Sequence, residues 1–132
     1  MMAIMSQYRI SEAAELLGVS PDTVRRQVDA GALTGSHDDA GRLVVAGEAL
    51  ARWAQERADS PHAGSGSSAR NRFTGLVTAI TSDAVMAQVD LQCGPYRVVS
   101  LMSAEAVRDL GLEVGARASA VVKATTVIVE AR

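Results

Sequence analysis

The chain has 132 residues, 48% of them apolar and 21% charged, with a formal net charge of −2. This composition predicts a folded, soluble protein of one average domain or two small ones, and excludes a disordered tail. No apolar run approaches the roughly 20 residues that span a bilayer, and the first ten residues lack a signal-peptide pattern, so we expect a cytoplasmic protein without membrane contact. The lone Cys93 cannot form an internal disulfide. His37 and His62 lack metal-ligand spacing, which argues against a zinc or redox site.

A run rich in Pro, Gly and Ser divides the chain. Residues 59–67 read DSPHAGSGS and have no apolar period, which predicts a flexible linker. Residues 1–58 have mostly helical patterns, whereas residues 68–132 mostly alternate like strands. The predicted fold class is therefore α+β in two domains. Each is near the lower size limit for independent folding, so we expect partner chains to contribute.

The first domain begins with two short helices joined by the tight turn GVS. We expect Ser11 to cap the first helix and Gly18 to end it, with one apolar face formed by Ala13, Ala14, Leu16 and Leu17. We expect Ser20 to cap the second helix, Pro21 to start it and Gly31 to end it. Val24 and Val28 would face inward. This layout predicts a helix-turn-helix.

The outward side of the second helix would face DNA. Its positions are Asp22, Thr23, Arg25, Arg26 and Asp29. Residues 34–46 then predict a β-hairpin with its turn near residues 38–41, followed by a helix that carries Leu50 and Trp53 toward the core. The alternative is an αα-hairpin that packs and binds nothing.

Residues 8–57 resemble the winged helix-turn-helix of the MerR and excisionase type, with residues 34–46 in the place of the wing. The DNA-binding residues expected from this arrangement are Thr23, Arg25, Arg26 and Arg42. Residues 1–62 hold six Arg and nine Asp or Glu, a net charge of −3, although most DNA affinity comes from neutralising phosphates. We therefore expect weak DNA binding per subunit, made effective by a dimer or larger assembly.

The sequence pattern of the second domain predicts an OB-like barrel of five strands and one short helix. Three alternating stretches cover residues 72–80, 84–92 and 96–102, and Ser103 would cap a helix that Gly111 closes. The last stretch predicts two more strands broken near Ala124. The aromatic side chains Phe73 and Tyr96 are too few for a base-stacking platform, so a small anion is the better ligand.

Short hydroxyl donors and cations recur at the ends of the predicted strands. Ser68 and Arg70 precede the first strand, Ser103 starts the helix, and Lys123, Ala124 and Thr125 lie at the strand break. Many donors with few acceptors suit a tetrahedral dianion. Each residue alone also fits a structural cap or a solvated charge, so the hypothesis depends on their joint occurrence.

The stretches SARNRFTGLV, VVSLMSAEAVRDLGLEVG and VVKATTVIV, within residues 67–132, resemble the Mop domain, also called TOBE or molbindin, which binds molybdate and tungstate. The resemblance implies an oxyanion site at an interface between subunits, with the Ser68 and Arg70 region of one chain and the Ser103 and Lys123–Thr125 regions of another. Its residues would be Ser68, Ala69, Arg70, Asn71, Ser100, Ser103, Lys123, Ala124 and Thr125.

The match departs from the family pattern at three positions. Ser103 replaces a Thr and Thr125 replaces a Ser, and both keep a hydroxyl group. Ala106 replaces a Ser and loses one, which weakens the predicted site. Ser100, on the strand before the helix, could substitute for it in part.

Together the two domains predict a regulator of transcription that responds to molybdate or tungstate and self-associates through its second domain, from a dimer to a hexamer. One alternative is a molybdate or tungstate storage protein without DNA binding. Another is an excisionase-type DNA-binding protein whose barrel serves only for oligomerisation. We do not expect an enzyme, because no nucleophile, base and orienting group recur with usable spacing.

Overall fold

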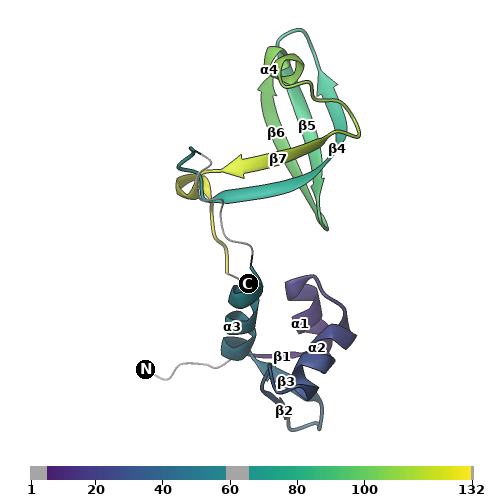
Figure 1. The fold of residues 1–132 in the computed structure, drawn as a ribbon, viewed down its shortest axis with the longest axis vertical. Coiled ribbons are helices and arrows are strands. Elements are labelled where there is room, and N and C mark those ends of the chain that lie inside the picture. Colours follow the sequence, from purple (N-terminus) through teal and green to yellow (C-terminus); the bar gives the residue numbers. More distant parts are fainter. Residues whose placement is uncertain (1–5, 59–65, 132) are drawn as a thin grey trace. The chain divides into compact units, whose positions relative to one another are not determined.

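The computed structural model describes residues 6–58 and 66–131, and the chain divides into two compact units, residues 1–59 and residues 60–132. Most of the predicted linker, residues 59–65, lies outside the described residues. Unit 1 is mostly helical and unit 2 is mostly β-sheet (Figure 1), which confirms the α+β prediction. No helix among the described residues is long and apolar enough to cross a membrane.

Unit 1 packs three helices on a small antiparallel sheet. Its elements are β1 (Gln7–Arg9), α1 (Ile10–Leu17), α2 (Pro21–Asp29), β2 (Gly35–His37), β3 (Leu43–Ala46) and α3 (Gly47–Arg57). The sheet order is β1-β3-β2, and β2 and β3 form the predicted hairpin. Strand β1 is an addition to the prediction, because three residues are too few to show an alternating pattern.

The two helix starts of the helix-turn-helix differ in how well the sequence predicted them. Ser20 caps α2 as expected, since its hydroxyl accepts a hydrogen bond from the Thr23 N–H at 3.1 Å. The cap of α1 is Arg9 rather than Ser11, so that prediction was wrong. The Glu12 carboxylate accepts the Arg9 backbone N–H at 2.9 Å, and this bond fixes the helix start two residues early. Gly18 ends α1 with φ 65°, as predicted.

The core of unit 1 contains Val24, Leu33, Val45, Leu50 and Trp53. Val24 is fully buried and Val28 packs against this core, as predicted. Leu16, also expected there, is 58% exposed. The residues of α1 that face the core are 10, 13, 14 and 17, which have the spacing of one helical face. Leu16 lies outside this face.

Unit 2 is a four-stranded antiparallel sheet in the order β6-β5-β4-β7 (Figure 1). Its elements are β4 (Asn71–Ser82), β5 (Met86–Cys93), β6 (Tyr96–Ser103), α4 (Ala104–Asp109), β7 (Arg117–Val122) and the 3₁₀ turn η1 (Ala124–Thr126). Strand β4 pairs with β7 through its first half and with β5 through its second, and the β4–β5 register shifts between Val77 and Ala79. This long strand curls the sheet into an open barrel.

The predicted fifth strand is not formed. After β7 the chain makes the η1 turn, and residues 127–131 belong to no strand. The side chains of Val127, Ile128 and Val129 are exposed. Strand-forming residues become a strand only where a sheet edge pairs with them, and η1 leads this segment away from its own sheet.

The buried cluster of unit 2 is smaller than that of unit 1. Val77, Val89, Leu91 and Cys93 are buried together. Among the described residues, exposed large apolar side chains gather in unit 2, whereas Leu16 is the one such side chain in unit 1. A monomer therefore leaves the apolar surface of unit 2 uncovered.

Candidate oxyanion site and DNA-facing surface

The start of β4 and the end of β7 bring two of the predicted anion-binding stretches together. Asn71 is paired with Val122, and its side-chain amide donates a hydrogen bond to the Val122 carbonyl at 3.1 Å. Arg70 directly precedes β4, and Lys123 directly follows β7. The two cations expected to hold the anion therefore flank the same end of the β4–β7 ladder.

The local hydrogen bonds leave mostly donors at this end of the sheet. The Lys123 carbonyl accepts from the Thr126 N–H at 3.0 Å and from the Thr126 hydroxyl at 2.8 Å. The Ser68 carbonyl accepts from Nη1 of Arg70 at 3.2 Å. The side chains of Ser68, Arg70, Lys123 and Thr125 are exposed, and Ala69 and Asn71 are half-buried. Because these acceptors are occupied, the surface offers hydroxyl and cationic donors to an anion.

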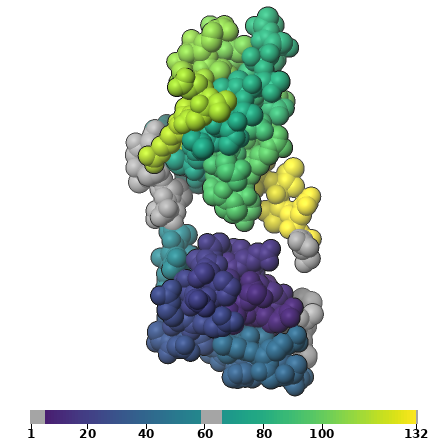
Figure 2. Space-filling view, turned by 90° about the vertical axis from the view of Figure 1, so that its right-hand side faces the viewer, coloured from purple at the N-terminus to yellow at the C-terminus, as the bar shows by residue number. Residues whose placement is uncertain are grey.

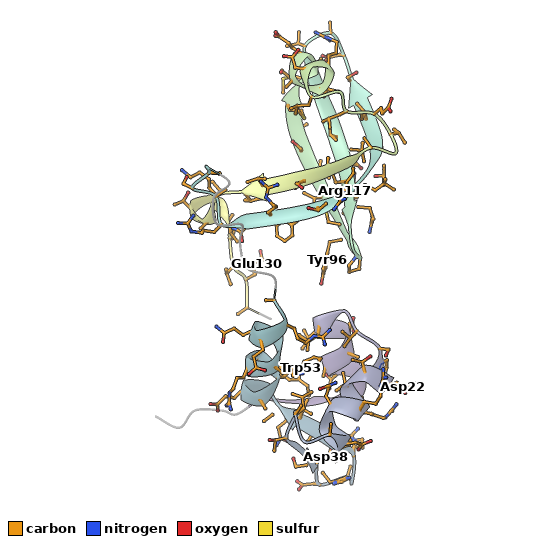
Figure 3. The ribbon with its side chains drawn as sticks, viewed as in Figure 1. Asp22, Asp38, Trp53, Tyr96, Arg117 and Glu130 are labelled. Atoms are coloured by element: carbon orange, nitrogen blue, oxygen red, sulfur yellow. The ribbon has the colours of Figure 1, made fainter. Side chains whose placement is uncertain are left out.

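The two sequence stretches that carry this cluster contain basic residues and no carboxylates. Residues 66–82 and 114–129 contain no Asp or Glu, while Arg70, Arg72, Arg117 and Lys123 all fall within them. Lys123 is also the single lysine of the chain. Arg117 lies on β7 opposite Leu76 (Figure 3). Arg117 is therefore at the opposite end of the ladder from the cluster, whereas Arg72 is the second residue of β4. Arg72 was not assigned to the site from the sequence, although the lack of carboxylates around it was a usable signal.

Ser103 lies at the other end of the sheet. It pairs with Met86 of β5, beside the last residues of β4, and its hydroxyl accepts the Ala106 N–H at 3.0 Å as the cap of α4. Ser100 pairs with Val89 and lines a cavity between β6 and β7. In one chain the structure therefore groups Lys123 with Arg70 and separates both from Ser103, whereas the family resemblance implied Lys123 and Ser103 together.

Two of the three arginines predicted to contact DNA have carboxylate partners. Arg25 lies 3.4 Å from Asp22, and Nε of Arg42 lies 3.1 Å from Oδ2 of Asp38 in the hairpin turn (Figure 3). The Arg42 backbone N–H donates to Asp38, and this bond, with the nearby guanidinium, holds the pKa of Asp38 below its ordinary value. Arg26 of α2 contacts the hydroxyl of the half-buried Thr23 at 3.5 Å. Phosphate groups must compete with these carboxylates for Arg25 and Arg42.

Comparison with known proteins decides the family. The TOBE domain matches residues 67–129. Molybdenum-pterin-binding protein 3 of Clostridium pasteurianum is 38% identical over 63 residues, which are 47% of this chain and 93% of that protein. The chain belongs to the TOBE domain family. A helix-turn-helix domain also matches residues 8–58, so both halves of the predicted resemblance are confirmed.

Two further proteins are similar to the TOBE domain of this chain. A probable molybdenum-pterin-binding protein of Haemophilus influenzae is 44% identical over 63 residues, 47% of this chain and 91% of that protein. The structure of a molybdate-binding protein from Sporomusa ovata has 31% identity and a TM-score of 0.48, and the match covers 49% of this chain and 97% of that one.

Proposed function

We propose that the TOBE domain binds molybdate through Arg70 and Lys123 at the end of the β4–β7 ladder. The placement of two cations at the same end of the β4–β7 ladder, without a nearby carboxylate in sequence, carries this proposal. Like charges close to each other repel, and a bound dianion attracts both cations and so offsets that repulsion. Ser68, Thr125 and backbone N–H groups supply the further donors that a tetrahedral oxyanion accepts.

The relatives support molybdenum as the element that is bound, since two are named molybdenum-pterin-binding proteins. Tungstate has the same charge and nearly the same size as molybdate, and it remains the alternative ligand. A molybdenum-pterin complex is a second alternative, suggested by those names. The exposed hydroxyl and cationic side chains at the cluster suit a small anion.

The complete site requires more than one copy of the chain. Ser103 lies at the opposite end of the sheet from Arg70, so a site that includes both takes Ser103 from a second subunit. The exposed apolar side chains of unit 2 support self-association, from a dimer to a hexamer. Ser100 lines the cavity between β6 and β7 and is not placed at the cluster of its own chain.

The helix-turn-helix domain supports DNA as the second partner. We propose a cytoplasmic regulator of transcription in which molybdate binding to the TOBE domains changes DNA binding by the helix-turn-helix domains. Thr23, Arg25, Arg26 and Arg42 are the proposed DNA contacts. The carboxylate partners of Arg25 and Arg42 favour weak binding per subunit and keep a storage protein without DNA binding as the second candidate. Both functions are binding functions without catalysis.

Calorimetric titration with molybdate, tungstate and sulfate tests the anion site. Loss of a charged hydrogen bond lowers affinity by about 10- to 100-fold, so Arg70→Ala and Lys123→Ala should each weaken molybdate binding by this factor. Arg52→Ala is the matched control, because Arg52 belongs to unit 1 and pairs with Glu48. Equal affinity in all variants would exclude the proposed site, and equal binding of sulfate would exclude selectivity for molybdate.

The single lysine allows an independent test. Acetic anhydride can modify the Lys123 amine and the chain's terminal amine, and mass spectrometry resolves the two products. Bound molybdate should slow acetylation of Lys123 and leave the terminal amine unaffected, whereas equal rates with and without molybdate would contradict the site. Binding to an operator-length DNA library with and without molybdate then separates a regulator from a storage protein.

A further inference from the structure

The outward face of α2 is centred on Arg26. Val24 of this helix is fully buried, and Val28 packs against the core of unit 1. Arg26 is two residues from each of them, and at about 3.6 residues per turn this places it about 200° around the helix, on the side away from the core. Its neighbour Arg25 is one residue from Val24 and lies on the flank. The space-filling view shows α2, in indigo, at the surface of unit 1 (Figure 2). A molecule that contacts the outer side of α2 therefore faces Arg26.

A chain of hydroxyl groups holds the Arg26 side chain. Nη2 of Arg26 lies 3.5 Å from the Thr23 hydroxyl oxygen, and this oxygen lies 2.8 Å from the Ser20 hydroxyl oxygen. Ser20 is itself fixed as the cap of α2, because it accepts the Thr23 N–H at 3.1 Å. Thr23 is β-branched and half-buried, so its side chain has few alternative rotamers. The Arg26 guanidinium is therefore oriented by neutral groups at the start of the helix.

The charge of Arg26 is not offset by a partner within unit 1. Among the described residues of unit 1 no ion pair involves Arg26, whereas the other two arginines proposed to contact DNA both have carboxylate partners. A guanidinium carries several N–H donors in a planar fork, and the contact with Thr23 uses one of them. Arg26 therefore keeps enough donors for two parallel hydrogen bonds. Guanine offers the matching pair of acceptors, O6 and N7, in the major groove of DNA.

Two carboxylates flank Arg26 on the outward face. Asp22 is four residues before it and Asp29 is three residues after it, so both lie one turn away on the same side of the helix, and both are exposed. Figure 3 shows Asp22 at the outer side of α2. Carboxylates repel phosphate groups, but they accept hydrogen bonds from the N4 amino group of cytosine. A cation between two carboxylates therefore matches the major-groove edges of G·C pairs better than it matches the phosphate backbone.

We propose that Arg26 recognises a guanine in the major groove through its O6 and N7 atoms, and that Thr23 is the residue that positions Arg26. The inference rests on the DNA binding proposed above, and it adds which side chain selects the sequence and which base is selected. Arg25 contributes charge but no selectivity, because it lies on the flank of the helix and its pairing with Asp22 must be broken first. The chain should therefore prefer half-sites with a G·C pair at the position that Arg26 contacts.

Selection of binding sites by the full chain from a random double-stranded DNA library tests this preference. The selection is made with and without molybdate, so that its outcome does not depend on how the anion changes DNA binding. At least one position of the selected half-site should be a G·C pair in nearly all sequences. Replacing that pair by A·T should lower the affinity of the wild type by about 5- to 100-fold, measured by fluorescence anisotropy.

Arg26→Ala separates base recognition from phosphate binding. This variant should lose the preference at one G·C position and keep the salt dependence of the wild type, because a base contact releases no phosphate counterion. Arg25→Ala is the matched control, since it removes the same charge from the adjacent residue and should keep the preference. Trp53 lies in the core of unit 1, so its fluorescence confirms that both variants are folded.

Two variants of Thr23 test its positioning role. Thr23→Val removes the hydroxyl and keeps a similar shape, so it should reduce the G·C preference severalfold, whereas Thr23→Ser keeps the hydroxyl and should retain the preference. A role in helix stability alone would weaken binding to the G·C and A·T DNAs by the same factor. Equal preferences in the wild type and Thr23→Val would remove Thr23 from the proposal.

Three results would overturn the assignment of Arg26. They are a selected half-site without a G·C pair, an Arg26→Ala chain that keeps every base preference, and an Arg26→Ala chain whose salt dependence falls by about one unit while its preferences remain, which is the behaviour of a phosphate contact. In each case DNA binding itself would stand. A chain that selects no DNA with or without molybdate would instead refute the regulator, and the assignment with it, and would leave the storage protein as the function.

Discussion

The side-chain amide of Asn71 donates to the carbonyl of Val122 at 3.1 Å, and this bond joins the stretch that carries Arg70 to the one that carries Lys123. Because the amide is engaged within the protein, we assign Asn71 a positioning role in the proposed site rather than a direct contact with the anion. Its partner strand, and not its own sequence neighbours, gives it that role.

Asn71→Ala should therefore lower molybdate affinity without removing a ligand. A neutral hydrogen bond contributes about 1 kcal/mol, so we expect a loss of about fivefold as Arg70 and Lys123 become less well fixed. Thr74→Ala is the control, since it also breaks a β4–β7 side-chain bond, the 2.9 Å contact with Ser119, but farther along the ladder. If calorimetry shows the same loss of molybdate affinity in both variants, the loss reflects lower stability of the domain and not the position of Asn71.

Ser103 should have two separable roles, in the helix cap and in the anion site. Ser103→Ala removes the cap of α4 and should cost about 1 kcal/mol of unfolding free energy as well as anion affinity. Ser103→Asp keeps a good cap and places a negative charge at the proposed site, so stability should be retained and molybdate binding lost. Urea unfolding and calorimetry on both variants check this, and unchanged molybdate binding by Ser103→Asp would remove Ser103 from the site.

Gly75 lies where β4 passes very close to β5. A Cβ added there would come within 2.3 Å of the Gln92 carbonyl oxygen and 2.7 Å of Cys93 Sγ. Gly75→Ala should therefore destabilise unit 2 by roughly 1–3 kcal/mol, as in other overpacked cores. Urea unfolding followed by circular dichroism should show the loss, whereas Trp53 fluorescence, which reports on unit 1, should be unchanged.

Gly94→Ala is the matched control for the close approach at Gly75. Gly94 has φ 58° with no atom within 4 Å of an added Cβ, so its cost is limited to the backbone conformation, about 1–2 kcal/mol. The two costs can be similar in size, so a second readout is needed. The clash at Gly75 should also shift the amide resonances of β4 and β5, whereas the local backbone cost at Gly94 should not. A Gly75→Ala chain with wild-type stability and spectra would show that β4 can move away from β5.

Asp38 should limit DNA binding by holding Arg42 in the hairpin. Asp38→Asn keeps an oxygen acceptor for the N–H groups of Ala40 and Arg42 but removes the charge that holds the Arg42 guanidinium. DNA affinity should rise, and the salt dependence should steepen by about one unit as one more phosphate contact forms. Fluorescence anisotropy at several salt concentrations measures both, and Asp39→Asn is the control because no ion pair involves Asp39 in the described hairpin.

Asp90 should make the stability of unit 2 fall in acid. The hydrogen bonds from Arg97, and then from Gln88, hold the pKa of Asp90 below its ordinary value. A lowered folded pKa contributes stability that is present above the ordinary value, about 3.9, and is lost as the pH falls through the folded value. Asp90→Asn should thus melt below the wild type at pH 7, with the difference shrinking below about pH 4. A constant difference across this range would refute the linkage.

The sequence by itself determined the elements whose signals are local. The cap at Ser20, the left-handed Gly18, the hairpin after residue 34 and three alternating strands depend on residues within a few positions of each other, so they were predicted correctly. The stretches SARN and VKAT likewise predict an anion site from the sequence alone. Two predictions for the first helix were wrong. Ser11 is not its cap, because the bond from the Arg9 N–H to Glu12 sets the helix start. Leu16 is not in the core, because the elements that pack on the helix decide which of its faces is buried.

Only the tertiary structure decided which distant residues meet. The antiparallel pairing of β4 with β7 brings Arg70 and Lys123 to the same end of the ladder, and the order of the strands moves Ser103 to the far end of the sheet. It also left residues 127–131 without a strand partner, although their sequence favours a strand. The physical reason is that a strand is stabilised by hydrogen bonds to a neighbouring edge, and the availability of that edge is a property of the assembled sheet rather than of the segment.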